Sequence, residues 1–373
     1  MQRFYFDHNA TTPVSPEVLE AMLPMMAEVY GNASSIHHFG QAARQKLDAA
    51  RKQVAGALGA EPQEIVFTSG GTESDNLAVL GLGGHVVTTT FEHPAVLASA
   101  AQCNQTLVPV DGRGMVDPAA IRRALRPDTK LISVMHANNE VGTIQPITEI
   151  ARIAAEAGVA MHSDGVQAMG KIPIKVADLG VSLYSISGHK IGAPKGVGVL
   201  YVRKGTGLKP MLYGGRHERE RRGGTENVAG AVSLGRALQW IADHGDAENR
   251  RIEDLRDRLE QNIASRIPDT HVNGAGAPRV PNTTNIRFDG IDSDALLIAL
   301  DLKGFAVSSG AACSSGAPEP SHVLLAMGLN RLEARSSIRF SLGRSNTVEQ
   351  ADALVEALVE SVAHLRKLAP AYV

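Results

Sequence analysis

The sequence predicts an α/β protein in which a mainly parallel sheet lies between two layers of helices, followed by a smaller α+β unit. Two observations support this prediction. Between about residues 60 and 205, short β-rich runs alternate with helical stretches, and several runs are almost continuously apolar, which is typical of strands covered by helices on both faces. After residue 268 the pattern changes to strand-like segments followed by helical ones.

Seven segments of the first region are predicted as strands. They are IVFTS (65–69), VVTTT (86–90), TLVPV (106–110), LISVMH (131–136), AMHSD (160–164), LYSIS (183–187) and GVLYV (198–202). Because ligand sites of such sheets lie at the carboxyl ends of the strands, chemistry is expected in the residues that follow these segments.

Helical periodicity flanks the predicted sheet on both sides. The helical segments are 17–30, 39–59, 226–244 and 246–266, and later 292–302 and 347–368. Residues 269–285 are rich in Gly, Pro, Asn and Thr and are predicted as a connection, with further strands at 284–288 and 337–342. We therefore expect a large domain at 14–250 and a small domain formed by 1–13 and 251–373.

Composition excludes several classes of protein. The 373 residues include 37 Lys and Arg against 39 Asp and Glu, so no net field draws the chain to nucleic acid. No run has the apolar length needed to span a membrane. Only Cys103 and Cys313 are present, which fits a reducing compartment, and we expect a cytoplasmic protein. His37, His38 and His136 lack metal-ligand spacing, so no metal is expected.

Three strand ends carry residues that suit one chemistry. The segment from Phe67 to Asn76 runs through two glycines into a helix, which suits a phosphate, although a simple turn capped by Thr72 explains it equally well. Asp164 can hold a ring nitrogen protonated, or it can cap a helix. Lys190 can act as a Schiff-base amine, or it can be a solvated surface charge. Together these residues are the parts that a pyridoxal phosphate (PLP) enzyme needs.

Two nucleotide-binding motifs are absent. The run from Gly165 to Lys171 has the form G-x-x-x-x-G-K, but Ile172 stands where a P-loop has the Mg²⁺-binding Ser or Thr. No G-x-G-x-x-G follows a predicted strand, which argues against a dinucleotide. His93, just after the second predicted strand, is a flat side chain suited to stacking on the PLP ring.

The sequence resembles the cysteine desulfurases of the NifS/IscS-like branch of the class V aminotransferase superfamily, over nearly the whole chain. The matching blocks are YFDHNATTP (from 5), GNASSIH (from 31), FTSGGTESDN (from 67), EH (from 92), HANNEVG (from 136), HSDGVQ (from 162), SGHK (from 187), GGTEN (from 223), SSGAACSSG (from 308) and RFS (from 339). The resemblance implies a PLP-dependent transferase of fold type I, with PLP in the large domain.

The resemblance also implies roles for particular residues. Lys190 would bind PLP covalently, Asp164 would pair with the pyridine nitrogen, Gln167 would contact the ring hydroxyl and His93 would stack on the ring. The phosphate would be held by Gly71, Thr72, Ser187, His189 and a threonine from the second subunit of a homodimer, here Thr225. Asn139 and Arg339 would hold the substrate carboxylate, since a guanidinium suits bidentate pairing.

The implied reaction converts L-cysteine to L-alanine and leaves the sulfur as a persulfide on Cys313, with Lys190 and His93 as further catalytic residues. A sulfur-acceptor or iron–sulfur scaffold protein would then receive the sulfur. Cys103 matches no block and is expected to be a buried structural thiol. The alternatives are a selenocysteine lyase or an aminotransferase on the same fold, and an inactive PLP-binding partner.

Overall fold

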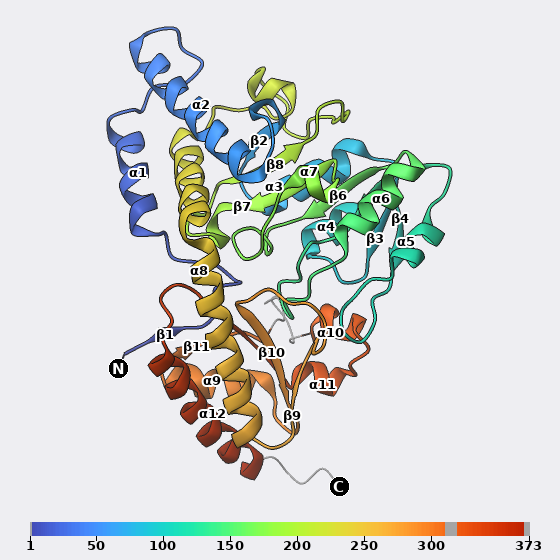
Figure 1. The fold of residues 1–373 in the computed structure, drawn as a ribbon, viewed down its shortest axis with the longest axis vertical. Coiled ribbons are helices and arrows are strands. Elements are labelled where there is room, and N and C mark those ends of the chain that lie inside the picture. The colour runs from blue at the N-terminus through green and yellow to red at the C-terminus, as the bar shows by residue number, and fades with distance from the viewer. Residues whose placement is uncertain (1, 310–318, 369–373) are drawn as a thin grey trace.

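The computed structural model describes residues 2–309 and 319–368 and contains a seven-stranded sheet (Figure 1). The strands are β2 (Ile65–Thr68), β3 (His85–Thr89), β4 (Asn104–Val108), β5 (Thr129–Ser133), β6 (Ala160–Asp164), β7 (Leu183–Ser187) and β8 (Gly198–Val202). Their order is β2-β8-β7-β6-β5-β3-β4, and β8 runs in the direction opposite to the other six strands. The prediction of a mainly parallel seven-stranded sheet is confirmed, with the limits of β6, β7 and β8 as predicted and those of the other strands displaced by up to three residues.

Helices cover both faces of this sheet. They are α1 (Pro16–Ala27), α2 (His38–Leu58), α3 (Gly71–Leu82), α4 (Pro94–Ala100), α5 (Pro118–Ala124), α6 (Ile147–Ala157), α7 (Val176–Leu179) and α8 (Val228–Arg266). Successive strand residues point to opposite faces: Leu183 packs with α3 and α4, whereas Tyr184 packs with the cluster that includes α2, α6 and α8. Burial on both faces explains why these strands are apolar throughout.

Helix α8 differs from the prediction, because 226–244 and 246–266 form one continuous helix of 39 residues. Gly245 and Asp246 suggested a break, since glycine in a helix costs about 1 kcal/mol relative to alanine. Gly245 is nevertheless helical and buried. Contacts of α8 with α1, α2 and α12 offset the local cost, and in Figure 1 the helix runs from the large sheet down into the lower part of the molecule.

The lower part has its own small sheet and apolar core. Its strands are β1 (Phe4–Tyr5), β9 (Thr270–Val272), β10 (Thr283–Phe288), β11 (Phe305–Ala306) and β12 (Ser337–Ser341). The helices are α9 (Ser293–Leu302), α10 (His322–Ala326), α11 (Arg331–Arg335) and α12 (Val348–Leu368). The sheet order is β12-β10-β9, all antiparallel, while β1 pairs with β11. The smaller α+β unit is thus present, and α8 supplies Ile252, Leu255 and Leu259 to its core.

The predicted connection at 269–285 is partly wrong, because it contains β9 and the start of β10. Strand β9 has only three residues and lies at the sheet edge, so it shows no alternating apolar pattern.

An arginine-rich segment before Thr225 is held by a buried ion pair. It includes the 3₁₀ turn η3 (His217–Glu220), in which Glu218 and Arg219 have φ values of 45° and 56°. The Glu218 carboxylate accepts hydrogen bonds from both terminal nitrogens of Arg51, at 2.7 and 2.6 Å, and from the backbone N–H of Phe67 at 3.1 Å. This contact anchors the segment to β2.

Across the described ranges, no helix combines the length and apolar character that crossing a bilayer requires.

Candidate active site

A cavity of about 580 Å³ lies at the carboxyl ends of β6 and β7, beside the start of α3. It gathers most of the residues assigned to the site from the sequence, namely Gly71, Thr72, His93, Asn139, Asp164, Gln167, Ser187, His189, Lys190 and Arg339. Thr225 is exposed and does not line this cavity, and Cys313 lies outside the described residues. Strand ends that are distant in sequence therefore converge here.

Lys190 lies in the 3₁₀ turn η2 (Gly188–Lys190), directly after β7. Its amine donates hydrogen bonds to the backbone oxygens of Asn9 at 2.5 Å and Ala10 at 2.7 Å. Burial, reinforced by the positive charge of Arg339, lowers the pKa of Lys190 from 10.5 to about 8. A lysine in this state is far more often unprotonated at neutral pH than a surface lysine, which is what a Schiff-base amine requires.

Asp164 ends β6 and is 5% exposed. One carboxylate oxygen accepts a hydrogen bond from the N–H of Val166 at 2.9 Å. Burial raises the pKa of Asp164, while the nearby His93 and Lys190 oppose this rise. Because Asp164 forms no ion pair with any described residue, a cation placed beside it would be strongly favoured. The protonated nitrogen of a pyridine ring is such a cation.

A second carboxyl group, Asp75 on α3, shares this region and was missed from the sequence. Burial, together with the neighbouring charge of Asp164, raises the pKa of Asp75 well above its usual value. Burial and the charge of Asp164 therefore disfavour the ionised form of Asp75.

His93 caps the N-terminus of α4, where its Nδ1 accepts a hydrogen bond from the N–H of Ala95 at 3.1 Å. Nδ1 is therefore unprotonated, and burial lowers the pKa of the ring, so the neutral form carries its proton on Nε2. His322 of α10 also lines the cavity and was not predicted; its Nε2 lies 2.9 Å from the backbone oxygen of Glu92. With His189, three imidazoles thus line the cavity.

The first turn of α3 forms a narrow cradle beside Ser187. A Cβ atom at Gly71 would lie 2.8 Å from Cγ2 of Val166 and 3.5 Å from Cβ of Ser187, so only glycine allows this close approach. Helix α3 presents free backbone N–H groups and the positive end of its dipole here. Thr72 and Ser187 add hydroxyls, so these residues fit the phosphate of PLP.

Arg339 of β12 lies on the opposite wall and is 5% exposed. Its guanidinium donates to Asp7 at 2.6 Å and to the backbone oxygen of Asn139 at 3.1 Å. The Nε atom has no hydrogen-bond partner within residues 2–309 and 319–368. A buried, incompletely satisfied guanidinium suits an incoming carboxylate.

Asn9 connects these groups, a role that no sequence pattern indicated. Its backbone oxygen accepts from Lys190 and, at 3.0 Å, from Nε2 of Gln167. Its side-chain nitrogen donates to the backbone oxygen of Asn139 at 3.0 Å and to the hydroxyl of Thr283 at 2.8 Å. The N-terminal segment therefore links both walls of the cavity.

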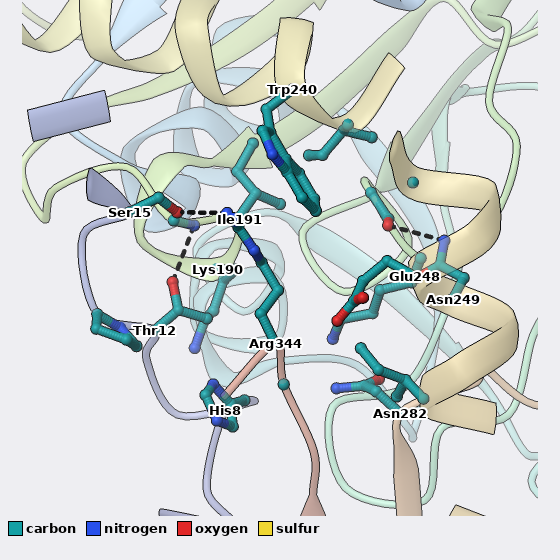
Figure 2. A pocket seen from close by; sticks show the side chains of 18 of the residues that line it. His8, Thr12, Ser15, Lys190, Ile191, Trp240, Glu248, Asn249, Asn282 and Arg344 are labelled. Atoms are coloured by element: carbon teal, nitrogen blue, oxygen red, sulfur yellow. Dashed lines mark hydrogen bonds between the residues drawn. The ribbon is translucent and has the colours of Figure 1, made fainter. Parts of the chain in front are cut away.

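A second cavity, of about 540 Å³, lies behind the first, and Lys190 lines both. Figure 2 shows this rear cavity, with Arg344 beside Trp240 and with His8 and Asn282 across from them. The guanidinium carbon of Arg344 lies 3.6 Å from the centre of the Trp240 ring. The residues expected to bind PLP and substrate, Lys190 apart, do not line this rear cavity.

Comparisons with known proteins agree with this geometry. A protein named cysteine desulfurase IscS from Methanosarcina thermophila is 48% identical over 378 residues, covering 98% of this chain and 93% of its own length. A cysteine desulfurase from Gluconacetobacter diazotrophicus is 46% identical, covering 99% of this chain and 96% of its own length.

Solved structures give the same result. A NifS-like protein superposes with a TM-score of 0.90 at 36% identity, covering 97% of this chain and all of its own. A structure described as SspA in complex with cysteine has a TM-score of 0.81 at 34% identity, covering 91% of this chain and 98% of its own. Residues 4–354 match the family described as Aminotransferase class-V, and the chain belongs to that family.

Proposed function

We propose that this protein is a PLP-dependent cysteine desulfurase that converts L-cysteine to L-alanine and transfers the sulfur to Cys313. The observation that carries the proposal is the convergence of three groups in one cavity: the Lys190 amine with its lowered pKa, the buried Asp164 carboxylate and the Arg339 guanidinium. The names of the relatives support cysteine as the substrate.

The residues divide the chemistry between them. When bound, PLP supplies a conjugated ring that can accept the negative charge left at the substrate Cα. Asp164 would hold the ring nitrogen protonated, and Arg339 with Asn139 would fix the substrate carboxylate. The free Lys190 amine could accept the Cα proton of the substrate because its pKa lies near neutrality.

Sulfur transfer follows from the reactivity of a thiolate. The Cys313 thiolate would attack the substrate sulfur, so that an S–S bond forms as the substrate C–S bond breaks. The products are alanine and a Cys313 persulfide, and no external oxidant is needed for this step. His93 would handle a proton in the cleft through Nε2, because only Nδ1 is used in the contact with the N–H of Ala95.

A homodimer is part of this proposal. Thr225 is exposed and outside its own cavity, as expected for a residue that completes the phosphate site of a second subunit. Apolar side chains on α1, on the connection that follows it and at the start of α2 support such an association: Leu19, Leu23, Met26, Tyr30, Ile36 and Phe39 are all exposed. The rings of Tyr30 and Phe39 stack there, with centroids 5.7 Å apart. A second copy of the chain would cover this surface.

The persulfide sulfur would be passed to an acceptor or scaffold protein, for iron–sulfur clusters or thio-cofactors. A persulfide is stable only where reductants and acceptors are controlled, and the low cysteine content fits the reducing cytoplasm.

The test is to incubate the purified protein with L-cysteine, PLP and a thiol reductant and to quantify both products. Equal amounts of alanine and sulfide are expected. Formation of 3-mercaptopyruvate together with a new amino acid from an added keto acid would instead show an aminotransferase, and turnover restricted to selenocysteine would show a lyase for that substrate.

A further inference from the structure

We propose that Lys171 is a positioning residue that fixes the orientation of the Gln167 amide, so that Gln167 presents an N–H group to the cofactor side of the cleft. The inference rests on the proposed function, since it concerns how the PLP ring is held. Lys171 ends the sequence run that resembles a P-loop, and the site as described so far gives this lysine no role.

The hydrogen bonds around Gln167 leave only one orientation of its amide. Nε2 lies 3.0 Å from the backbone oxygen of Asn9, which can only accept. Oε1 lies 2.5 Å from the amine of Lys171, a donor. Both contacts identify Oε1 as the oxygen and Nε2 as the nitrogen of the amide. One N–H of Gln167 therefore donates to Asn9, and the other remains available to the cleft.

Lys171 is itself held in place by a second acceptor. Its amine donates to Oδ1 of Asn9 at 2.8 Å, and the same oxygen accepts from Nδ2 of Asn282 at 3.0 Å. Lys171 also lines the rear cavity of Figure 2, so its amine lies between the two cavities. The lysine therefore supports Gln167 from behind and does not itself line the PLP cavity.

The charges around Lys171 favour a hydrogen-bonding role over an ion pair. No described carboxylate lies within ion-pair distance of Lys171, while Lys190, Arg339 and His8 face it. Burial, followed by the charges of Lys190 and Arg339, lowers the pKa of Lys171 well below its usual value. Although this position disfavours its charged form, the Lys171 amine donates hydrogen bonds to Oε1 of Gln167 and Oδ1 of Asn9.

The orientation matters for the group that Gln167 is expected to contact, the ring oxygen of PLP. An N–H donor stabilises negative charge on that oxygen. The nitrogen that would join PLP to Lys190 should then lose its proton at a lower pH, because the oxygen stabilises the protonated nitrogen less. Without Lys171, Oε1 loses its donor and only the contact of Nε2 with Asn9 holds the amide.

The experiment compares holoenzymes of Lys171→Met and of the control Lys175→Met, an exposed lysine four residues away. PLP affinity and the pH midpoint of the visible absorption of bound PLP are measured. Lys171→Met should bind PLP about tenfold more weakly, as expected for one lost hydrogen bond, and its midpoint should rise by about one pH unit. Lys175→Met should match the wild type.

A double-mutant cycle separates positioning from a bare charge effect. In a Gln167→Leu background, Lys171→Met should cause no further change in the midpoint. An equal change in both backgrounds, or no change in either, would overturn the proposal. If Lys171→Met does not fold, Lys171→Gln keeps a donor and should retain most of the wild-type midpoint; a full loss would also overturn the proposal.

A crystal structure of the Lys171→Met protein without PLP provides a readout that does not depend on the cofactor. Gln167 should be rotated or disordered there, and an unmoved amide would contradict the inference. Failure of the wild-type protein to bind PLP would refute the proposed function, and this structure would still decide the role of Lys171.

Discussion

The lowered pKa of Lys190 predicts how the protein captures PLP as pH changes. With a pKa of about 8, roughly one amine in ten is unprotonated at pH 7, whereas a lysine at 10.5 would have about one in 3,000. The environment therefore raises the reactive fraction by about 300-fold. Capture of PLP by the apoenzyme should accelerate about tenfold for each pH unit below 8 and level off above it.

The perturbation that tests the cause is Arg339→Gln, because Arg339 is the charge that contributes most to lowering this pKa after burial. Removing one like charge should raise the midpoint by roughly 0.5 to 1 pH unit. Arg335→Gln is the matched control, since Arg335 pairs with Asp292 at the surface, with 46% of its side chain exposed.

Stopped-flow absorption after mixing apoenzyme with PLP at pH 6 to 10 measures this midpoint. Nα-acetyllysine, treated in the same series, corrects for the titration of PLP itself. A midpoint near 10, or an unchanged midpoint in Arg339→Gln, would refute the assignment of burial and Arg339 as the causes.

Three further predictions concern other residues. Cys313→Ser should retain PLP and still bind cysteine but release neither alanine nor sulfide in a product assay. The control is Cys103→Ser, at a half-buried thiol whose pKa is raised by burial, and it should keep its activity. Normal desulfuration by Cys313→Ser would refute the persulfide mechanism. Asp164→Asn should bind PLP yet lose at least about 100-fold in kcat, as expected when a preorganised charge is removed, and kinetics that match the wild type would contradict its role. Arg51→Met leaves the Glu218 carboxylate buried without its partner and should lower the free energy of unfolding, measured with urea, by about 3 to 5 kcal/mol. Adding Glu218→Leu should recover much of this loss. An unchanged urea midpoint in Arg51→Met would show that the pair is not buried in solution.

The centre of the site could be predicted because it depends on strand ends. Strands β6 and β7 are parallel neighbours, so residues that follow them, Asp164 and Lys190, must lie at the same edge. The first turn of α3 directly follows β2, so it too could be predicted to lie at a strand end. Periodicity in the sequence therefore carries enough information to bring these groups together.

The supporting groups could not be predicted in this way. Asn9 and Lys190 are 181 positions apart and meet through a backbone oxygen, which leaves no side-chain pattern. His322 begins a helix of only five residues, too short to show periodicity. The continuous course of α8 through Gly245 depends on packing against other helices, which outweighs the local preference of glycine.

The N-terminal segment holds two of the charged groups of the cleft. Asp7 holds the Arg339 guanidinium at 2.6 Å, while the next residues along the chain, Asn9 and Ala10, hold the Lys190 amine through their backbone oxygens. A substrate carboxylate at Arg339 would have to share that guanidinium with Asp7, and the Lys190 amine would have to leave the two oxygens to bind PLP. Both contacts belong to one short segment of the chain. Residues 7–10 therefore position both the group proposed to bind the substrate carboxylate and the group proposed to bind PLP.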